Sequence, residues 1–468
     1  MKKYPAVKLI ILCCFLVLTG CVSSKYQQQH LTDILEYTEE IQEKYVSDEE
    51  WWKQYDNEEI NRLIEIALER NPDYLKAAVN INKQLYNLSL TTSDFFPTFD
   101  SSLKASSQRA IYKDDNFANT FSGEVGLSYE IDLYGKIRNA RSAQEFELKA
   151  TVMDQATAKL SLINSVIDLF FNLEYLENAI ALTNENINSY TEIEEIIGNQ
   201  YRIGATDGLE LLQAEQNLLS GQKSLLDLET QFREMEQSLR NILNIKPDED
   251  LGIVYSSLLD QKNLGVNVDV PLSVLANRPD LIASQYRLEE AFKTLKAGER
   301  EWYPSISLSG AINTSSGKAL TTFKFPYILG SVSVSLPFLD WNRVRNNIRI
   351  SEADYQIALI DFNDTLNQAL NEVAYYYFAY QKSIEIFDKS QEISDTAEKI
   401  ADYYDRRYTA GKAGFKDLLE AINSKNSSKM DLIQQKYQII KYENYIYKAM
   451  AGRYTVSENA QDQAVSQQ

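Results

Sequence analysis

The chain is a tandem duplication, because the same landmarks recur at one fixed spacing. "RNPDYLKAA" near residue 70 returns as "NRPDLIASQ" near residue 277, and "YGKIRNARS" returns as "WNRVRNNIR". One offset held over so long a stretch is not chance, so the chain must build the same architecture twice. The matching positions, all 207 residues apart, are Pro72 and Pro279, Pro97 and Pro304, Arg138 and Arg345, Tyr201 and Tyr408, and Gly204 and Gly411.

Each copy contains long stretches without glycine or proline. Residues 136–197, 338–410 and 415–451 hold neither, and they are rich in residues that favour helix. Apolar side chains recur in steps of three, four and seven, as in a coiled coil. We therefore predict long helical hairpins at about 136–244 and 342–451. Further helices are expected at about 57–95 and 279–302, stacked end to end with the shorter hairpin arms.

A period-two pattern precedes each long hairpin. Apolar residues alternate with serine, aspartate and glutamate, which predicts β-hairpins at about 98–132 and 304–338. Strands of about ten residues have the length of a tilted transmembrane strand. An ordinary half-buried sheet would give the same pattern, but four strands are too few to close. Because the backbone in lipid requires a closed barrel, we expect several chains to contribute strands to one barrel.

The N-terminus reads as an export signal. Three lysines precede an apolar run at 9–18, which is too short to span a bilayer and is followed by Thr19-Gly20-Cys21. A short buried helix is the alternative, and it fits the basic start poorly. Residues 18–21, with the sequence Leu-Thr-Gly-Cys, resemble a bacterial lipobox. That resemblance implies a signal peptide at 1–20 and a lipid-anchored N-terminal segment at 21–56, with a covalent lipid on Cys21.

Composition excludes several functions. The chain has 47 basic and 67 acidic side chains, so nucleic acid is not an expected partner. One histidine, His30, argues against histidine-based catalysis and against a multi-histidine metal site. Cys13 and Cys14 lie in the leader, so no disulfide is expected. We expect no catalytic residue, no metal site and no cofactor beyond the lipid on Cys21.

Several segments together resemble the TolC-like outer membrane factors. They are "WWKQYDNEEINRLIEIALERNPDYLKAA", "YEIDLYGKIRNA", "YPSISLSG" and "YTAGKAGFKDLLEA". The resemblance is strongest to the lipoprotein exit ducts of tripartite resistance-nodulation-division pumps. It covers residues 21 to about 453. It implies a mixed α and β fold: a homotrimeric, 12-stranded transmembrane β-barrel with four strands per chain. The barrel would continue into a long α-helical periplasmic barrel.

The same resemblance implies location, partners and function. The protein would sit in the outer membrane, in contact with its lipid, and have a large periplasmic portion. It would work with a periplasmic adaptor protein and an inner-membrane pump. Its role would be that of a passive conduit that exports drugs, toxic compounds or metal ions.

The resemblance also implies a periplasmic gate at the two helical hairpin turns. Asp417 and Glu420 match acidic pore-facing positions, while Tyr408 and Glu210 match positions of the closing network. The alternative for the two acids is a solvated helix start, which the helix dipole favours. Ala413 stands where some relatives carry a tip arginine, which puts a copied salt bridge in doubt. The basic residues that could replace that arginine are Arg202, Arg406 and Arg407.

The expected domain order follows the duplication. The first repeat spans 57–265 and the second 266–453, and 454–468 is a polar tail expected to be disordered. Two other classes of protein stay open. A lipid-anchored coiled-coil spacer or adhesin would not need two alternating strand pairs. A periplasmic hydrolase is disfavoured by the single histidine.

Overall fold

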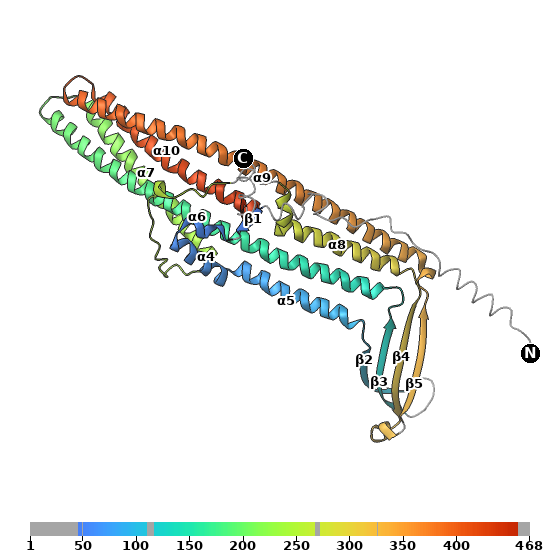
Figure 1. Ribbon diagram of the computed structural model, residues 1–468. Helices are drawn as coiled ribbons and strands as arrows, with labels where there is room; N and C mark the ends of the chain where they lie inside the picture. The colour runs from blue at the N-terminus through green and yellow to red at the C-terminus, as the bar shows by residue number, and fades with distance from the viewer. Residues whose placement is uncertain (1–44, 49, 110–116, 267–271, 325, 457–468) are drawn as a thin grey trace, which may run out of the picture. The chain divides into compact units, whose positions relative to one another are not determined.

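The computed structural model describes residues 45–48, 50–109, 117–266, 272–324 and 326–456 (Figure 1). Its described residues form two compact units. We call the residues of Ile81–Thr151 and Ala283–Asn363 the sheet unit. The described residues of Leu31–Asn80, Val152–Ile282 and Asp364–Gln468 form the helical unit.

The sheet unit contains a four-stranded antiparallel sheet with the order β2-β3-β4-β5. The strands are β2 (Thr98–Gln108), β3 (Ala118–Ile131), β4 (Ser305–Ser316) and β5 (Tyr327–Ser335). Both predicted β-hairpins are therefore present, and β3 pairs with β4 to join the two copies. The outer edges of β2 and β5 have no strand beside them in the described chain.

The register gives the sheet one apolar and one polar face, because directly paired residues point to the same side. On one face Val125 lies opposite Ile312, which lies opposite Ile328; on the other Glu124 lies opposite Asn313. The apolar side chains are open, with Ile328 79% exposed. The apolar face carries Phe99, Leu103, Phe121, Val125, Leu127, Tyr129, Ile131, Ile306, Leu308, Ile312, Ile328, Val332 and Val334, with Ser101, Ser107, Thr314 and Ser316 among its polar exceptions. The polar face carries Asp100, Ser102, Lys104, Ser122, Glu124, Ser128, Glu130, Ser305, Ser307, Ser309, Asn313, Ser331, Ser333 and Ser335, with Tyr327 and Leu329 as exceptions.

Two long helical hairpins follow the strands, as predicted. The first is α6 (Lys136–Arg202) with α7 (Gly208–Leu243), and the second is α9 (Trp341–Thr409) with α10 (Phe415–Ala449). Both hairpins turn through the same glycine motif. Gly204 and Gly411 have φ of 75° and 67°, which glycine adopts without steric cost, and the next residue's N–H bonds back at 2.8 Å in each copy.

The helices that precede the strands differ from the prediction in one copy. A single helix was expected at about 57–95, but α4 (Glu58–Arg70) ends at Asn71 and α5 (Pro72–Ser93) begins at Pro72. Pro72 disfavours helical backbone at Asn71, which is extended and caps α5 instead. The second copy has only a short 3₁₀ turn, η3 (Leu272–Asn277), before α8 (Pro279–Arg300).

The expectation of a disordered tail from residue 454 is wrong for its first residues. Strand β6 (Arg453–Val456) pairs with β1 (Tyr45–Asp48) in a separate two-stranded sheet. Tyr454 is only 5% exposed, so burial of its ring adds to the backbone pairing. Residues 457–468 lie outside the described chain.

The core of the helical unit forms where the segment after α7 crosses the helices. Buried aromatic residues gather there, among them Trp51, Phe170 and Phe171. We call residues 251–266 the belt, because their backbone is bonded to several helices of this unit: Arg62 donates to the carbonyl of Leu251 at 2.9 Å. Within the described residues, no helix has the length and apolar character needed to cross a membrane.

Two helices of the helical unit carry apolar side chains that no described residue covers. On α7, Leu212, Leu219 and Leu226 are spaced by seven and are 57–63% exposed. On α9, Ile386, Ile393 and Ile400 have the same spacing and are 45–58% exposed. We call these the α7 stripe and the α9 stripe. Seven-residue spacing is the pattern by which helices pack against partner helices.

Candidate functional site

The hairpin turns of the two copies are held together by an apolar cluster of the helical unit. Tyr190 and Ile197 of α6, Ala214 of α7, and Phe415 and Leu419 of α10 are its buried members. Residues far apart in the sequence therefore meet at one end of the four helices (Figure 1). This cluster positions the predicted gate residues.

Tyr408 links the second hairpin to the first. Its hydroxyl donates to Oε1 of Gln200 at 3.3 Å, and its ring lies 6.1 Å from that of Phe415. Burial and, more weakly, the charge of Glu210 raise the pKa of Tyr408, although the bond to Gln200 opposes this. The phenol therefore stays protonated and keeps its donor. Its counterpart in the first copy, Tyr201, is 48% exposed.

Glu210 and Asp417 are equivalent positions, each in the first turn of a second hairpin arm. Glu210 accepts a hydrogen bond from the hydroxyl of Thr206. Asp417 accepts one at 3.3 Å from the N–H of Gly414, the residue before α10. A carboxylate at this position satisfies a free N–H and favours the helix dipole. This contact supports the solvated-helix-start alternative for Asp417.

Glu420 and the basic residues near the turns make local contacts. Glu420 is exposed and lies 3.7 Å from Nζ of Lys416 on the same helix. Arg407 donates to the carbonyl of Lys412 at 2.8 Å, and Arg202 donates to Asn199. Within the described residues, none of the three candidates Arg202, Arg406 and Arg407 forms a salt bridge between the hairpins.

A polar network next to the turns escaped the sequence reasoning. The hydroxyl of Tyr190 donates to Asn423 at 2.7 Å and accepts from Asn426 at 3.1 Å. Asn423 also donates to Asn217 at 2.8 Å. These residues join α6, α7 and α10. Their signal was the occurrence of asparagine in helices that otherwise bury apolar side chains.

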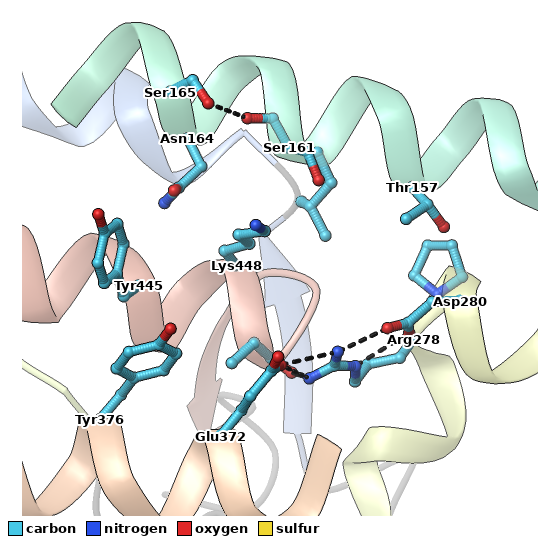
Figure 2. Close-up of a pocket in the computed structure, with 13 residues that line it drawn as sticks. Thr157, Ser161, Asn164, Ser165, Arg278, Asp280, Glu372, Tyr376, Tyr445 and Lys448 are labelled. Atoms are coloured by element: carbon cyan, nitrogen blue, oxygen red, sulfur yellow. Dashed lines mark hydrogen bonds and ion pairs between the residues drawn. The ribbon is translucent and has the colours of Figure 1, made fainter. Parts of the chain in front are cut away.

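A second feature of the helical unit is a cavity of about 280 Å³ beside Arg278 (Figure 2). The Arg278 guanidinium donates two bonds to Asp280, at 3.0 and 2.6 Å, and two to Glu372, both at 3.0 Å. It also donates to the carbonyl of Ala449 at 2.9 Å. Burial by itself raises the pKa of Asp280, but the hydrogen bonds and the positive charge of Arg278 outweigh it. The pKa of this carboxyl therefore lies below its usual value.

This arginine is a structural clamp rather than a ligand site. Its duplicate position is Asn71, which donates to the carbonyl of Ile242 at 2.9 Å. Ile242 and Ala449 are themselves duplicate positions, so both copies fasten the end of the second hairpin arm in the same way. Arg278 lies in the repeat motif "NRPDLIASQ", but that motif gave no indication of this clamp.

Two buried carboxylates hold the belt. Glu174 accepts from the N–H and the hydroxyl of Ser256, at 3.0 and 2.6 Å, and its other oxygen has no partner in the described chain. Glu443 accepts from the N–H of Gly265 at 2.5 Å and the hydroxyl of Tyr55 at 3.2 Å. Burial raises the pKa of both carboxyls despite these hydrogen bonds.

Cys21 lies outside the described residues, so its predicted lipidation stays a prediction. Among the described residues, no three histidine, cysteine, aspartate or glutamate side chains are grouped to hold a metal ion.

A two-faced sheet with unpaired edges, joined to long hairpins with uncovered apolar stripes, defines the protomer of an oligomeric membrane channel. Comparison with known proteins agrees. The family model described as "Outer membrane efflux protein" matches residues 63–244 and 270–452. The chain belongs to the outer membrane efflux protein family. Its members are passive channels, not enzymes, and they work as homotrimers with periplasmic adaptors and inner-membrane pumps.

Individual relatives and solved structures are consistent with this family. "Toxin and drug export protein A" of Aggregatibacter actinomycetemcomitans is 38% identical over 94% of this chain and 96% of its own length. An uncharacterized protein of Haemophilus influenzae is also 38% identical, over 93% and 96%. The Campylobacter jejuni CmeC outer membrane channel has the same fold, with a TM-score of 0.80, 24% identity and 96% of each chain covered. The predicted family, fold class, function and outer-membrane location are thus confirmed.

Proposed function

We propose that three copies of this chain form an export duct whose two hairpin turns close its periplasmic end. The observation that carries this proposal is the sheet with one apolar and one polar face. A face with thirteen large apolar or aromatic side chains suits lipid, and a face of serines and carboxylates suits a water-filled interior.

The sheet edges require neighbouring copies. Unpaired N–H and C=O groups are costly in lipid, so β5 of one copy must pair with β2 of the next. Three chains then close a barrel of twelve strands, since each contributes four. A barrel of that size leaves an aqueous channel, because about eight strands are the limit that side chains fill.

The helices support the same assembly. Packing within one chain leaves the α7 stripe and the α9 stripe exposed. Contact between copies would bury both, and each buried leucine or isoleucine contributes roughly 1.5–3 kcal/mol when fully covered. The helical hairpins of three copies would then form the wall of a tunnel.

The gate would lie at the turns. Tyr408 joins the hairpins through Gln200, and the charge of Glu210 acts on its hydroxyl. Asp417 and Glu420 would supply carboxylates that threefold symmetry repeats around the pore. The cargo would include drugs or toxic compounds, since a relative is named for the export of toxin and drug. A lipid on Cys21 would add a second attachment to the membrane.

Planar-bilayer recording of the purified protein tests the duct. We expect discrete channels from a trimer, with a low conductance that reflects a closed tip. A stable monomer without channel activity would contradict the proposal and favour the spacer alternative.

Lipidation is tested separately by mass spectrometry of the mature N-terminus. We expect a chain that begins at acylated Cys21. The Cys21→Ser variant should still form trimeric channels, because the barrel provides the larger membrane attachment. An unmodified mature Cys21 would refute the lipid but leave the duct intact.

A further inference from the structure

The sheet unit places basic side chains where the strands end and the long helices begin. The first turns of α6 and α9 contain no acidic residue. The first turn of α6 holds Lys136 and Arg138, the first turn of α9 holds Arg343, and Arg345 follows at the start of the second turn of α9. The start of a helix carries a partial positive charge, so the helix itself disfavours these cations. Arg138 and Arg345 are duplicate positions, so basic side chains lie near the start of the long helix in both copies.

This junction is basic in an acidic protein. We define it as residues 131–141, 299–305 and 336–349, which together hold seven basic and four acidic side chains. The whole chain has 47 basic against 67 acidic side chains. The positive charge is therefore concentrated at the junction.

The acidic groups of the junction are already engaged. Asp132 accepts the N–H groups of Ile137 and Arg138 at 3.1 and 3.0 Å. Glu301 lies 3.6 Å from Nζ of Lys136, and Asp340 lies 3.2 Å from Arg343.

Three arginines stay open. Arg138, Arg345 and Arg349 are exposed, and none of their guanidinium groups has an ion-pair partner in the described part of the chain. They are therefore available to an external anion.

A cavity of about 300 Å³ lies within the junction. Lys136, Arg300 and Arg343 line it together with Tyr134 and Tyr303. The two tyrosine rings stack at 4.7 Å, and the Arg300 guanidinium lies 5.8 Å from the centre of the Tyr303 ring. Three carboxylates also line the cavity: Glu130, Asp132 and Glu301.

Exposed tryptophans and leucines surround this basic region. Trp302 and Trp341 are 38% and 52% exposed, and Leu133 and Leu339 are 58% and 72% exposed. Tryptophan is enriched at membrane–water interfaces, where its ring bridges apolar and polar surroundings. The apolar face of the sheet ends at Ile131, Ile306 and Val334, immediately beside this region.

We propose that the junction binds the phosphodiester headgroups of anionic phospholipids in the membrane leaflet that it faces. The inference rests on the proposed function, since it requires the sheet to lie in the bilayer. Arginine forms charge-assisted, bidentate bonds with phosphate oxygens, and basic pockets beside membrane-spanning elements suit such headgroups. Contacts of this kind would fix the depth at which the barrel sits.

Native mass spectrometry of the full-length assembly tests this proposal. The protein in detergent is titrated with dioctanoyl phosphatidylglycerol and, separately, with dioctanoyl phosphatidylcholine, which differ only in the headgroup. We expect preferential retention of phosphatidylglycerol. In the triple variant R138Q/R343Q/R345Q the ratio of bound phosphatidylglycerol to bound phosphatidylcholine should fall by about fivefold or more. Each basic residue near an anionic lipid surface contributes about a fivefold gain in affinity. Equal retention of both lipids by the unaltered protein would overturn the proposal.

A matched control removes three exposed lysines of the helical unit, as K76Q/K223Q/K389Q, and should keep the preference. The R138K/R343K/R345K variant keeps the charge and should keep most of it. The preference of the unaltered protein should also fall with added salt. A salt-insensitive preference, or a triple glutamine variant that still prefers phosphatidylglycerol, would contradict the assignment even if another variant failed to fold.

Two further readouts separate the alternatives. If sn-glycerol 3-phosphate binds as tightly as the lipid, the site is one for free phosphate and the lipid assignment is wrong. Channel recording on the same preparation isolates the proposed function: trimeric channels without headgroup preference would refute this inference alone.

Discussion

Single residues decide how firmly the two hairpins are joined. Tyr408 bonds to Gln200 across the hairpins, while its duplicate Tyr201 is half exposed and has no hydrogen bond from its hydroxyl in the described chain. Duplication has therefore left one tyrosine with a contact that the other lacks. This asymmetry provides an internal control for the gate.

Tyr408→Phe should raise the conductance of the trimer in planar bilayers. The change removes only the hydroxyl, and a lost hydrogen bond costs roughly 1 kcal/mol, or about a fivefold shift between closed and open states for each bond. Tyr201→Phe should leave the conductance unchanged. An equal effect of both variants would show that Tyr408 does not hold the gate closed.

The acidic residues at the turns should set ion preference. Asp417→Asn with Glu420→Gln removes both charges but keeps an acceptor for the N–H of Gly414. If the carboxylates line the pore, the double variant should show weaker cation preference and weaker block by multivalent cations. Reversal potentials in a salt gradient measure the first effect.

The control for this prediction removes two exposed carboxylates from α4, as E65Q/E69Q. It should not alter selectivity. Unchanged selectivity in the D417N/E420Q variant would return both residues to the role of a solvated helix start, and the channel assignment would stand.

At the scale of elements, the periodic patterns in the sequence were sufficient to predict the strands and helices. They were not sufficient to predict contacts between distant segments. Strands β2 to β5 and the long hairpins lie within a few residues of their predicted bounds, because period and punctuation are local properties. The break between α4 and α5 at Asn71 is caused by Pro72, and the predicted single helix did not take the effect of this proline into account. The pairing of β1 with β6 joins segments about four hundred residues apart, which leave no local signal.

The candidate site likewise contains residues that could be predicted from the sequence and residues that could not. The family resemblance placed Tyr408 and Glu210 at the turns. In the structure the charge of Glu210 acts on the Tyr408 hydroxyl and helps to raise its pKa. The asparagine network and the Arg278 clamp were missed, because each needs partners on helices whose relative register the sequence does not give. Ring formation by Asp417 and Glu420 concerns three chains and stays a prediction.

The belt should make stability depend on pH. Burial raises the pKa of Glu174 above its usual 4.5, so the folded state binds the proton more tightly than the unfolded state. The stability from this group is fully present below pH 4.5 and is lost as the pH rises through the folded pKa. Glu174→Gln mimics the protonated form and should unfold at a higher temperature than the unaltered protein at pH 7.

Thermal unfolding followed by circular dichroism measures this difference. It should shrink as the pH approaches 4, where Glu174 itself becomes protonated. Glu177→Gln, an exposed change three residues further along α6, should have little effect at any pH. A constant difference between Glu174→Gln and the unaltered protein across this range would contradict the buried charge as the cause.

At the scale of the whole molecule, the uncovered α7 and α9 stripes predict that assembly stabilises the helices as well as the strands. Leu219 lies in the middle of the α7 stripe and is 57% exposed in the single chain. A charge there would be buried between copies and could not be paired, which is strongly unfavourable.

Leu219→Glu should therefore weaken or abolish the trimer, as measured by light scattering in detergent. Ser224→Glu adds the same charge at an exposed position on a different side of α7 and should leave the trimer intact. A stable Leu219→Glu trimer would mean that the stripe faces water in the assembly.

The β1–β6 sheet has a consequence for the order in which the chain matures. Tyr45 pairs with Val456, so this contact encloses nearly the entire polypeptide in one loop. The entropy of closing a loop grows with its length, and contacts between distant residues slow folding. During synthesis and export the first residues emerge long before the last, so β1 has no partner for most of that time. The pairing can form only after the whole chain has been delivered, which makes it a late step that marks completion of the helical unit.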